Sequence, residues 1–417
     1  MARRHRVVIV GAGFGGLSAA KALSGADIDV LVIDRRNHHL FQPLLYQVAS
    51  AALSPADIAV PIRSILAGQK NVTVLLGKVT GVDTAAKSVQ LADGPVPYDT
   101  LILGTGARHA YFGHPEWEAD APGLKTLGDA TAIRHRLLAA FERAEATDDP
   151  AARRRLMTVA VIGGGPTGVE MAGAVAELAK TTLKGEFRKI DPRETRILLV
   201  EAGPRILTSF PEALSVKAAK QLARLGVEVH LGTPVSLCDE DGIVVGEERI
   251  PAATVIWGAG VQASPVGKWL GVETDRAGRV PVQGDFSVAG QPDIFVVGDV
   301  ATLKDRDGTL LPGVAPAAKQ AGAYVADVIK ARLAGKSTPK PFRYRNYGNV
   351  ATIGRGAAVA DFGWAKFSGM IAWWLWGIVH IFFLIGFRNR IVVAINWLWS
   401  YLTFKRGARL ITEDKTP

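Results

Sequence analysis

Two short glycine-rich turns hold the residues of this chain that are best suited to chemistry. In the first turn, Gly11, Gly13 and Gly16 follow an apolar run at residues 7–10 and precede a run of small residues. In this spacing the first glycine permits a tight turn, the second lets the backbone approach a pyrophosphate, and the third lets a helix pack closely on a strand. Asp34 ends the next apolar run, where a carboxylate can accept hydrogen bonds from ribose hydroxyls. These residues predict a dinucleotide-binding site, against the alternative of a glycine turn that holds no ligand.

The second turn repeats this pattern later in the chain. Gly163, Gly165 and Gly168 again follow an apolar run, and Glu201 ends the next one after a longer insert. A carboxylate at that position repels a 2′-phosphate, so the pattern favours NADH over NADPH. Arg205 lies near enough in the sequence to weaken this preference.

Two dinucleotide sites in one chain indicate one resident and one visiting dinucleotide. The simplest interpretation is FAD at the first turn and a nicotinamide dinucleotide at the second. The stretch "DIFVVGDVA" supports it, because Gly298 and Asp299 end a predicted strand and can aim a carboxylate at a ribityl hydroxyl. The alternative is an aspartate in an ordinary β-turn.

Side chains that could hold a metal or exchange disulfides are scarce. The chain has one cysteine, Cys238, which cannot form an internal disulfide, a CxxC pair or a thiolate zinc cage. This excludes mechanisms in which paired thiols carry electrons. His38 and His39 lie just after Asp34, but no cluster of carboxylates and histidines converges with them in the sequence. We predict no metal site.

The charge balance raises the question of an anionic partner. The formal net charge is +10, which can favour nucleic acid or an anionic membrane surface. The basic run Arg153–Arg155 lies in a stretch, 147–156, that reads as a linker. We interpret this run as a solvated face and predict no nucleic-acid partner.

The elements that must position these residues follow from the hydrophobic pattern. Each glycine turn joins a predicted strand to a helix, as in a parallel α/β unit. Short alternating stretches between residues 72 and 107 predict an antiparallel layer that returns to the first sheet. Residues 124–146 and 314–335 have helical spacing.

The C-terminal region has a different composition. Residues 367–387 include no Asp, Glu, Lys or Arg, and six of the nine tryptophans lie beyond Gly363. About 20 apolar residues can cross a bilayer as a helix, so a single span, a buried helical hairpin and interfacial helices all fit. Trp prefers the membrane interface, and Arg388 and Arg390 can reach anionic head groups from there. We favour helices lying in the interface.

Longer motifs carry a resemblance to a known family. These motifs are "GAGFGGL", "FQPLLYQVAS", "LILGTGA", "GGGPTGVEMAG", "VIWGAGVQASP", "FVVGDVA", "GVAPAAKQAG" and the tail "FLIGFRNRIVVAINWLWSYLTFKRGARLI". The glycine turns are shared with many flavoproteins, whereas "FQPLLYQVAS" and the tail are more specific. With these motifs the whole chain resembles the type II NADH dehydrogenases, which are single-subunit NADH:quinone oxidoreductases.

The resemblance implies roles for particular residues. The predicted FAD-binding residues are Gly11, Ala12, Gly13, Phe14, Gly15, Gly16, Asp34, Arg35, Val79, Thr105, Gly106, Asp299 and Ala318. The predicted NADH-binding residues are Gly163, Gly165, Pro166, Thr167, Gly168, Glu201 and Gly260.

Three further residues are candidates for the reaction itself. The resemblance puts Glu170 near the flavin–nicotinamide junction, although it could instead be a capping carboxylate in the first turn of its helix. Lys319 and Gln320 are the candidates for the flavin–quinone junction. There the sequence departs from the family pattern, because Pro316 follows Ala315 where many members have Gln.

These observations combine into one predicted architecture. We expect an α/β protein with two Rossmann-like dinucleotide-binding domains and a C-terminal membrane-docking helical segment. The FAD domain is predicted at residues 1–115 and 275–340, the NADH domain at 116–274, and the membrane-associated segment at 341–417.

The predicted activity is hydride transfer from NADH to FAD, followed by transfer of two electrons to a membrane quinone, without proton pumping. The quinone could be ubiquinone or menaquinone. The resemblance also favours a homodimer at the cytoplasmic face of the cell membrane. Two alternatives stay open: a sulfide:quinone oxidoreductase, which needs paired cysteines, and an NADH-sensing flavin-bearing interaction protein.

Overall fold

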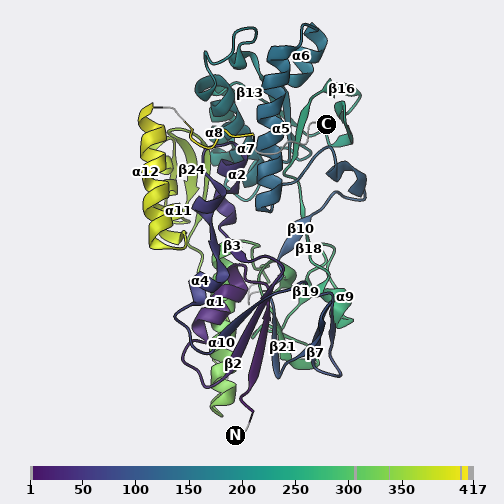
Figure 1. Ribbon diagram of the computed structural model, residues 1–417, viewed down its shortest axis with the longest axis vertical. Helices are drawn as coiled ribbons and strands as arrows, with labels where there is room; N and C mark the ends of the chain where they lie inside the picture. The colour runs from purple at the N-terminus through teal and green to yellow at the C-terminus, as the bar shows by residue number, and fades with distance from the viewer. Residues whose placement is uncertain (1–2, 305–307, 338, 404–405, 412–417) are drawn as a thin grey trace. The chain divides into compact units, whose positions relative to one another are not determined.

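A computed structural model describes residues 3–304, 308–337, 339–403 and 406–411. The chain divides into two compact units, and Figure 1 labels many of their elements. Unit one comprises Met1–His39, Val60–Arg108 and Val261–Tyr347. Unit two comprises Leu40–Ala59, His109–Gly260 and Gly348–Pro417. The three functional domains expected from the sequence stay a prediction.

A six-stranded sheet forms the centre of unit one, in the order β20–β21–β9–β1–β2–β5. Its strands are β1 (Arg6–Val10), β2 (Asp29–Asp34), β5 (Val72–Leu76), β9 (Thr100–Leu103), β20 (Ser287–Val288) and β21 (Gln291–Val296). All neighbours pair in parallel except the edge strand β20. Val7, Val8 and Ile9 have no exposed surface, as expected for a parallel strand covered on both faces.

Two layers cover this sheet. Helices α1 (Phe14–Ala22) and α10 (Ala315–Leu333) pack against each other so closely that a Cβ at Gly322 would lie 2.0 Å from the Gly15 carbonyl oxygen. Val8 and Val10 share a core with Val89 of the antiparallel sheet β6–β7–β8. That sheet consists of β6 (Gly81–Asp83), β7 (Ser88–Leu91) and β8 (Gly94–Pro97). The predicted antiparallel layer is therefore confirmed for these strands, whereas β5 joins the parallel sheet.

A four-stranded parallel sheet forms the centre of unit two, in the order β13–β12–β11–β17. Its strands are β11 (Thr158–Ile162), β12 (Arg196–Glu201), β13 (Val227–Leu231) and β17 (Thr254–Trp257). Its longer helices are α5 (Leu127–Ala146), α7 (Pro166–Glu177) and α8 (Glu212–Arg224). The antiparallel strands β14 (Val235–Asp239), β15 (Gly242–Val245) and β16 (Glu248–Pro251) form a further sheet.

The stretch expected to be a linker is a helix. α6 (Pro150–Leu156) begins with a proline at its first position, and the Asp149 carboxylate accepts a hydrogen bond from the Ala151 backbone at 2.9 Å. A side-chain cap followed by proline is a strong helix start. The linker prediction is wrong because it rested on the polar composition and passed over this start signal.

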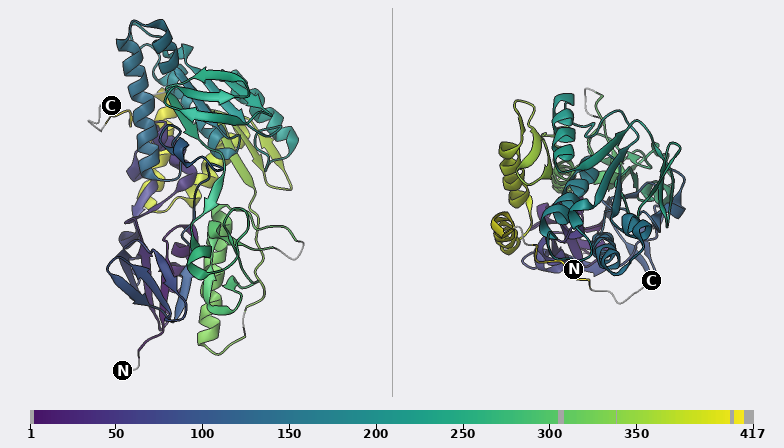
Figure 2. Two further views of the ribbon diagram at one scale, coloured as in Figure 1. Left: turned by 90° about the vertical axis from the view of Figure 1, so that its right-hand side faces the viewer. Right: turned by 90° about the horizontal axis from the view of Figure 1, so that it is seen from above.

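The C-terminal part of unit two combines a small sheet with two helices. Antiparallel β23 (Asn349–Gly354), β24 (Ala357–Asp361) and β25 (Lys366–Ser368) precede α11 (Met370–Phe383) and α12 (Phe387–Thr403). The sheet rests on α7, where a Cβ at Gly173 would lie 1.7 Å from the Ile353 carbonyl oxygen. α11 packs on β24 and α12 lies beside α11, both yellow in Figures 1 and 2. Among the described residues, no helix combines the length and apolarity needed to cross a membrane.

Shorter elements complete the two units. They are β3 (His38–Leu40), α2 (Leu45–Ala49), α3 (Pro55–Ile58), β4 (Ala59–Pro61), α4 (Ile62–Leu66), β10 (Ala107–His109), β18 (Val261–Ala263), α9 (Val266–Leu270), β19 (Val280–Pro281) and β22 (Ala301–Thr302).

Candidate active site

The first glycine turn connects β1 to α1 in a conformation that only glycine allows. Gly11 has φ +98°, and a Cβ there would lie 2.5 Å from the Gly104 carbonyl oxygen. A Cβ at Gly16 would lie 1.9 Å from the Gly11 carbonyl oxygen. Gly13, the residue preceding α1, has open space instead, since a Cβ added there would meet only the Gly104 oxygen at 3.9 Å. The turn thus presents an accessible helix N-terminus, which suits a pyrophosphate.

The second turn repeats this geometry between β11 and α7. Gly163 has φ +105°, and a Cβ there would lie 2.7 Å from the Ala259 nitrogen. A Cβ at Gly168 would lie 1.8 Å from the Gly163 carbonyl oxygen. At Gly165, which precedes α7, no atom would lie within 4 Å of an added Cβ. Both units therefore offer the same cradle for an anionic group.

The two acids also have matching hydrogen bonds. Asp34 Oδ2 accepts from the Ala12 backbone N–H at 2.7 Å, and Glu201 Oε2 accepts from the Gly164 N–H at 2.5 Å. The second oxygen of each carboxylate accepts from the N–H two residues further on, in Arg36 at 2.8 Å and in Gly203 at 2.7 Å. Each carboxylate therefore stabilises the conformation of its own glycine turn through a hydrogen bond. Because each oxygen has two lone pairs, both carboxylates can still accept a ribose hydroxyl.

A cavity of about 530 Å³ opens at the second turn. Gly163, Gly165, Glu201 and Gly260 line it, so it brings together four residues that the sequence predicted for NADH. Its wall also includes Phe112, Trp117, Pro234, Ser236, Trp257 and Ala259. The motifs contained little signal for these residues, since aromatic side chains at strand ends are also ordinary core residues. Pro166 and Thr167 begin α7 beside Gly165.

The other residues predicted for FAD surround the N-terminus of α1. A Cβ at Gly15 would lie 3.3 Å from the Ala318 oxygen, and a Cβ at Gly298 would lie 3.5 Å from Ala318 Cβ. Asp299 lies in the short turn Gly298–Val300, just after β21. The structure therefore brings "GAGFGG", "GDV" and the start of α10 together.

Four more predicted residues lie in unit one at different exposures. Thr105 and Ser264 are joined by a hydrogen bond between their hydroxyls. Gly106 has φ +71° with open space around it. Val79 is buried in the core, whereas Arg35 is exposed.

His39 has a role that the sequence did not reveal. Its Nδ1 donates to the Ala12 carbonyl at 2.8 Å, and its ring meets Phe14 edge-on with centroids 5.1 Å apart. Burial, together with the charges of Lys21 and Lys319, lowers the pKa of His39 to about 4, so the imidazole is neutral at pH 7. His39 thus supports the first glycine turn, and the motif spacing contains no signal for this contact.

The three candidate catalytic residues differ in environment. Lys319 is half-buried in the first two turns of α10, next to Gln320. Burial raises the pKa of Glu170 to about 8, against the opposing effects of the Thr352 backbone N–H and the Trp376 indole. The first turn of α7 contains no acidic residue, because Glu170 lies one turn further on, so the capping alternative is wrong. Gln320 is tied to the Arg345 backbone, because Nε2 donates to its oxygen and Oε1 accepts from its nitrogen, both at 2.9 Å.

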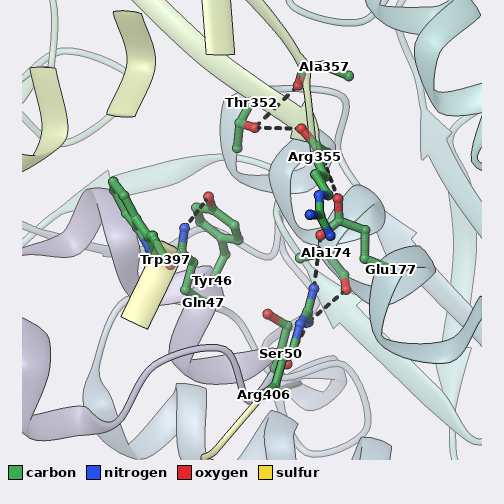
Figure 3. Close-up of polar contacts among 11 residues, drawn as sticks. Tyr46, Gln47, Ser50, Ala174, Glu177, Thr352, Arg355, Ala357, Trp397 and Arg406 are labelled. Carbon is green, nitrogen blue, oxygen red and sulfur yellow. Dashed lines mark hydrogen bonds and ion pairs between the residues drawn. The ribbon is translucent and has the colours of Figure 1, made fainter. Parts of the chain in front are cut away.

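The family-specific stretch "FQPLLYQVAS" is joined to the tail. Gln47 Nε2 donates to the Tyr46 hydroxyl at 2.9 Å, and Gln47 Oε1 accepts from the Trp397 indole at 2.7 Å (Figure 3). Asn389 donates to the Asp57 carbonyl at 3.0 Å. α12 is therefore fixed to α2 and α3 within unit two, although these segments lie far apart in the sequence.

The single cysteine is not placed for redox chemistry. Cys238 is buried in β14, and burial raises the pKa of its thiol to about 12. The thiolate, which is the reactive form, is therefore negligible at neutral pH.

The fold and the duplicated turns define a pyridine-nucleotide-dependent oxidoreductase with two dinucleotide-binding folds. Residues 5–322 match the family model described as pyridine nucleotide-disulphide oxidoreductase, and residues 347–406 match the NDH2 C-terminal domain. The type II NADH:quinone oxidoreductases Ndh and NdhA of Mycobacterium tuberculosis are each 47% identical to this chain over 99% of its length. The match covers 91% of Ndh and 90% of NdhA. The chain belongs to the type II NADH:quinone oxidoreductase family.

Solved structures agree with this fold. The NDH2 of Plasmodium falciparum in complex with NADH has a TM-score of 0.90 at 20% identity, covering 99% of this chain and 100% of that chain. The sulfide:quinone oxidoreductase of Aquifex aeolicus has a TM-score of 0.74 at 19% identity, covering 98% and 96%. At these identities the structures show the shared fold alone.

Proposed function

We propose that this protein oxidises NADH and passes the electrons to a membrane quinone through bound FAD. The observation that carries the proposal is the duplicated glycine turn with its bracing acid, in a chain whose whole length matches this family. One turn suits a resident dinucleotide and the other a visiting one. The nucleotide-binding and catalytic roles of individual residues are part of the proposal.

The first turn is the proposed FAD site. The N-terminus of α1 would hold the pyrophosphate, Asp34 would accept a ribose hydroxyl, and Asp299 would accept a ribityl hydroxyl. Bound FAD would supply the hydride acceptance and electron release that no side chain of the chain can provide. The protein's part is to orient these groups and exclude water. The neutral His39 stabilises the conformation of the turn through its hydrogen bond to Ala12, and it adds no charge to the site.

The second turn is the proposed NADH site, and Glu201 sets its preference against a 2′-phosphate. Arg205 does not offset this preference, because its guanidinium donates to the carbonyl oxygens of Leu207, Thr208 and Phe210 and to the Ser215 hydroxyl. The same cation therefore holds the following loop together. The expected substrate is NADH rather than NADPH.

The C-terminal helices are the proposed membrane-docking surface. The helical apolar residues exposed over more than half of their surface are Ile371, Trp374, Ile378, Phe382, Phe387, Ile395, Leu398, Trp399 and Leu402. A hairpin buried within the unit would not expose them. Peripheral docking at the cytoplasmic face of the cell membrane would bring the site to a lipid-soluble quinone, ubiquinone or menaquinone. The net charge of +10 favours an anionic membrane surface. The family resemblance favours a homodimer.

Anaerobic stopped-flow absorbance tests the reaction. Mixing the yellow protein with NADH should bleach the flavin band, and a soluble quinone analogue should restore it equally fast. Bleaching without recovery would instead support the NADH-sensing alternative, and no bleaching would overturn the nicotinamide site. The sulfide:quinone alternative fails on the lone buried Cys238.

A further inference from the structure

Unit two contains a second large cavity, separate from the one at the glycine turn. It has a volume of about 970 Å³, and no residue lines both cavities. Its walls come from α3, α5 and α12, the segment after α7, and residues 406–411. Most of the wall is apolar, with contributions from Leu138, Phe141, Leu183, Phe187 and Trp399.

One arginine in this wall stands at a core position of its helix. α5 buries residues at helical spacing, including Ala130, Ile133, Leu137 and Phe141, and Arg134 lies on the same stripe. The Arg134 residue is only 7% exposed. An amphipathic helix normally has an apolar residue at such a position.

The Arg134 guanidinium makes no hydrogen bond and no ion pair with any residue that the structure describes. Burial alone acts on its pKa and lowers it, with no charged neighbour opposing the shift. The guanidinium nitrogens are not among the fully buried atoms that lack a partner, so the unpaired charge faces the open cavity. This arrangement is therefore typical of a site that an anion completes.

The other two arginines of the wall are already paired. Arg406 donates to the Ser50 carbonyl at 2.8 Å and the Ala174 carbonyl at 3.2 Å, and its ion pair with Glu177 is 3.0 Å long (Figure 3). Arg409 pairs with Glu186 at 2.5 Å. These contacts fix the 406–411 segment as a wall of the cavity, and they leave Arg134 as the cation without a counter-charge among the described lining residues.

The remaining acids of the wall do not neutralise Arg134. Asp57 accepts from the Ser54 backbone N–H at 2.8 Å and closes the capping box of α3. Glu142 lies about two turns along α5 from Arg134 and is exposed. The cavity therefore combines one unpaired cation, open to the cavity, with apolar walls, which is the complement of an anionic amphiphile.

We propose that this cavity binds an anionic membrane phospholipid, whose phosphate contacts Arg134 and whose acyl chain lies along the apolar wall. A guanidinium can form two parallel hydrogen bonds to a phosphate. A membrane lipid is the expected ligand because the cavity adjoins the proposed membrane-docking surface. Trp399 lines the cavity and also belongs to the exposed apolar face of α12, where it is 60% exposed. The site goes beyond the proposed function, since NADH oxidation does not require it.

The test uses the purified full-length, flavin-loaded protein and three probes. These are dioctanoyl phosphatidylglycerol, dioctanoyl phosphatidylcholine and inorganic phosphate. Binding is measured by the shift in melting temperature and by native mass spectrometry. The variants are Arg134→Gln and the matched control Arg143→Gln, which removes an exposed arginine from the same helix. Arg134→Met serves as a second variant of the site.

We expect phosphatidylglycerol to bind the wild type and Arg143→Gln alike, and to bind Arg134→Gln about tenfold to a hundredfold more weakly. Without lipid, Arg134→Met should melt at the wild-type temperature or higher, because the variant removes a charge that no side chain compensates and keeps an apolar side chain on the buried stripe of α5. A purely structural arginine would give the opposite sign.

Four results would overturn the proposal. If phosphatidylcholine bound as tightly as phosphatidylglycerol, the site would not select lipids by negative charge. If inorganic phosphate raised the melting temperature as much as phosphatidylglycerol, the site would be one for free anions. A change in oligomeric mass in Arg134→Gln would mean that a second copy of the chain covers the cavity. Unchanged phosphatidylglycerol binding by Arg134→Gln would place the lipid elsewhere. NADH-dependent flavin bleaching, measured alongside, should be the same in all variants, so that a failure of the proposed function is seen separately.

Discussion

At the scale of single residues, Glu170 should make the stability of the protein depend on pH. Its folded pKa of about 8 exceeds the ordinary value of 4.5, so the folded state holds a proton that the unfolded chain releases between these values. The free energy of unfolding should therefore fall by about 1.4 kcal/mol per pH unit in this window, relative to a variant that cannot titrate. Denaturant unfolding of the wild type and Glu170→Gln from pH 5 to 9 measures this. Parallel curves for the two proteins would refute the assignment.

A second residue-scale prediction concerns coenzyme choice. Glu201→Gln removes the negative charge that opposes a 2′-phosphate, while one amide oxygen can still accept from the turn. The ratio of kcat/KM for NADH to that for NADPH should fall about tenfold, which corresponds to about 1.4 kcal/mol. Steady-state kinetics with both coenzymes measures the ratio. Arg205→Gln is the control, since its guanidinium is engaged by the following loop, and a larger change of the ratio there would contradict our account.

At the scale of elements, two glycines of the second strand–turn–helix unit should have different roles, one in stability and one in NADH binding. Gly168→Ala puts a Cβ 1.8 Å from the Gly163 oxygen, so α7 must move away from the turn and we expect a loss of about 2 kcal/mol or more in stability. Gly165→Ala meets open space in an extended conformation, so the fold should persist while NADH binding weakens about tenfold. Thermal melting and NADH titration measure the two effects. Gly68→Ala, also in open space, should change neither.

At the scale of the whole molecule, membrane attachment should need both charge and the apolar helix faces. Ile371 and Ile378 are 62% and 63% exposed on α11. Changing both to Asn should leave stability nearly unchanged and weaken vesicle binding by about 1.5–3 kcal/mol per side chain that inserts fully. Sedimentation with vesicles measures this, and wild-type binding should fall with salt and with loss of anionic lipid.

The matched control lies on another helix. Val216 on α8 is 47% exposed, and Val216→Asn should leave sedimentation unchanged. If the α11 double variant still sedimented like the wild type, the docking surface would lie elsewhere.

Much of this protein could be predicted from local pattern. Both glycine turns, their strands and helices and the two acids were visible because a G-x-G-x-x-G turn has a fixed backbone geometry, and the structure repeats it in both units. The family was visible as well, and whole-length similarity confirms it. The helix at 150–156 was missed although Asp149 and Pro150 form a helix start signal, because the linker prediction rested on the polar composition.

Other features were decided only by the tertiary structure, because they depend on contacts between residues distant in the chain. The sequence alone determined that two dinucleotide turns, a lone cysteine and an apolar tail occur together. It could not show that His39 supports the first turn, that burial protonates Glu170, or that Gln47 holds Trp397. Nor could it show that Arg134, on an ordinary amphipathic helix, is buried in a cavity without a partner in the described structure. Local conformation follows from neighbouring residues, whereas burial is a property of the packed chain. Shifted pKa values and unpaired charges depend on burial, so they too are decided by the tertiary structure.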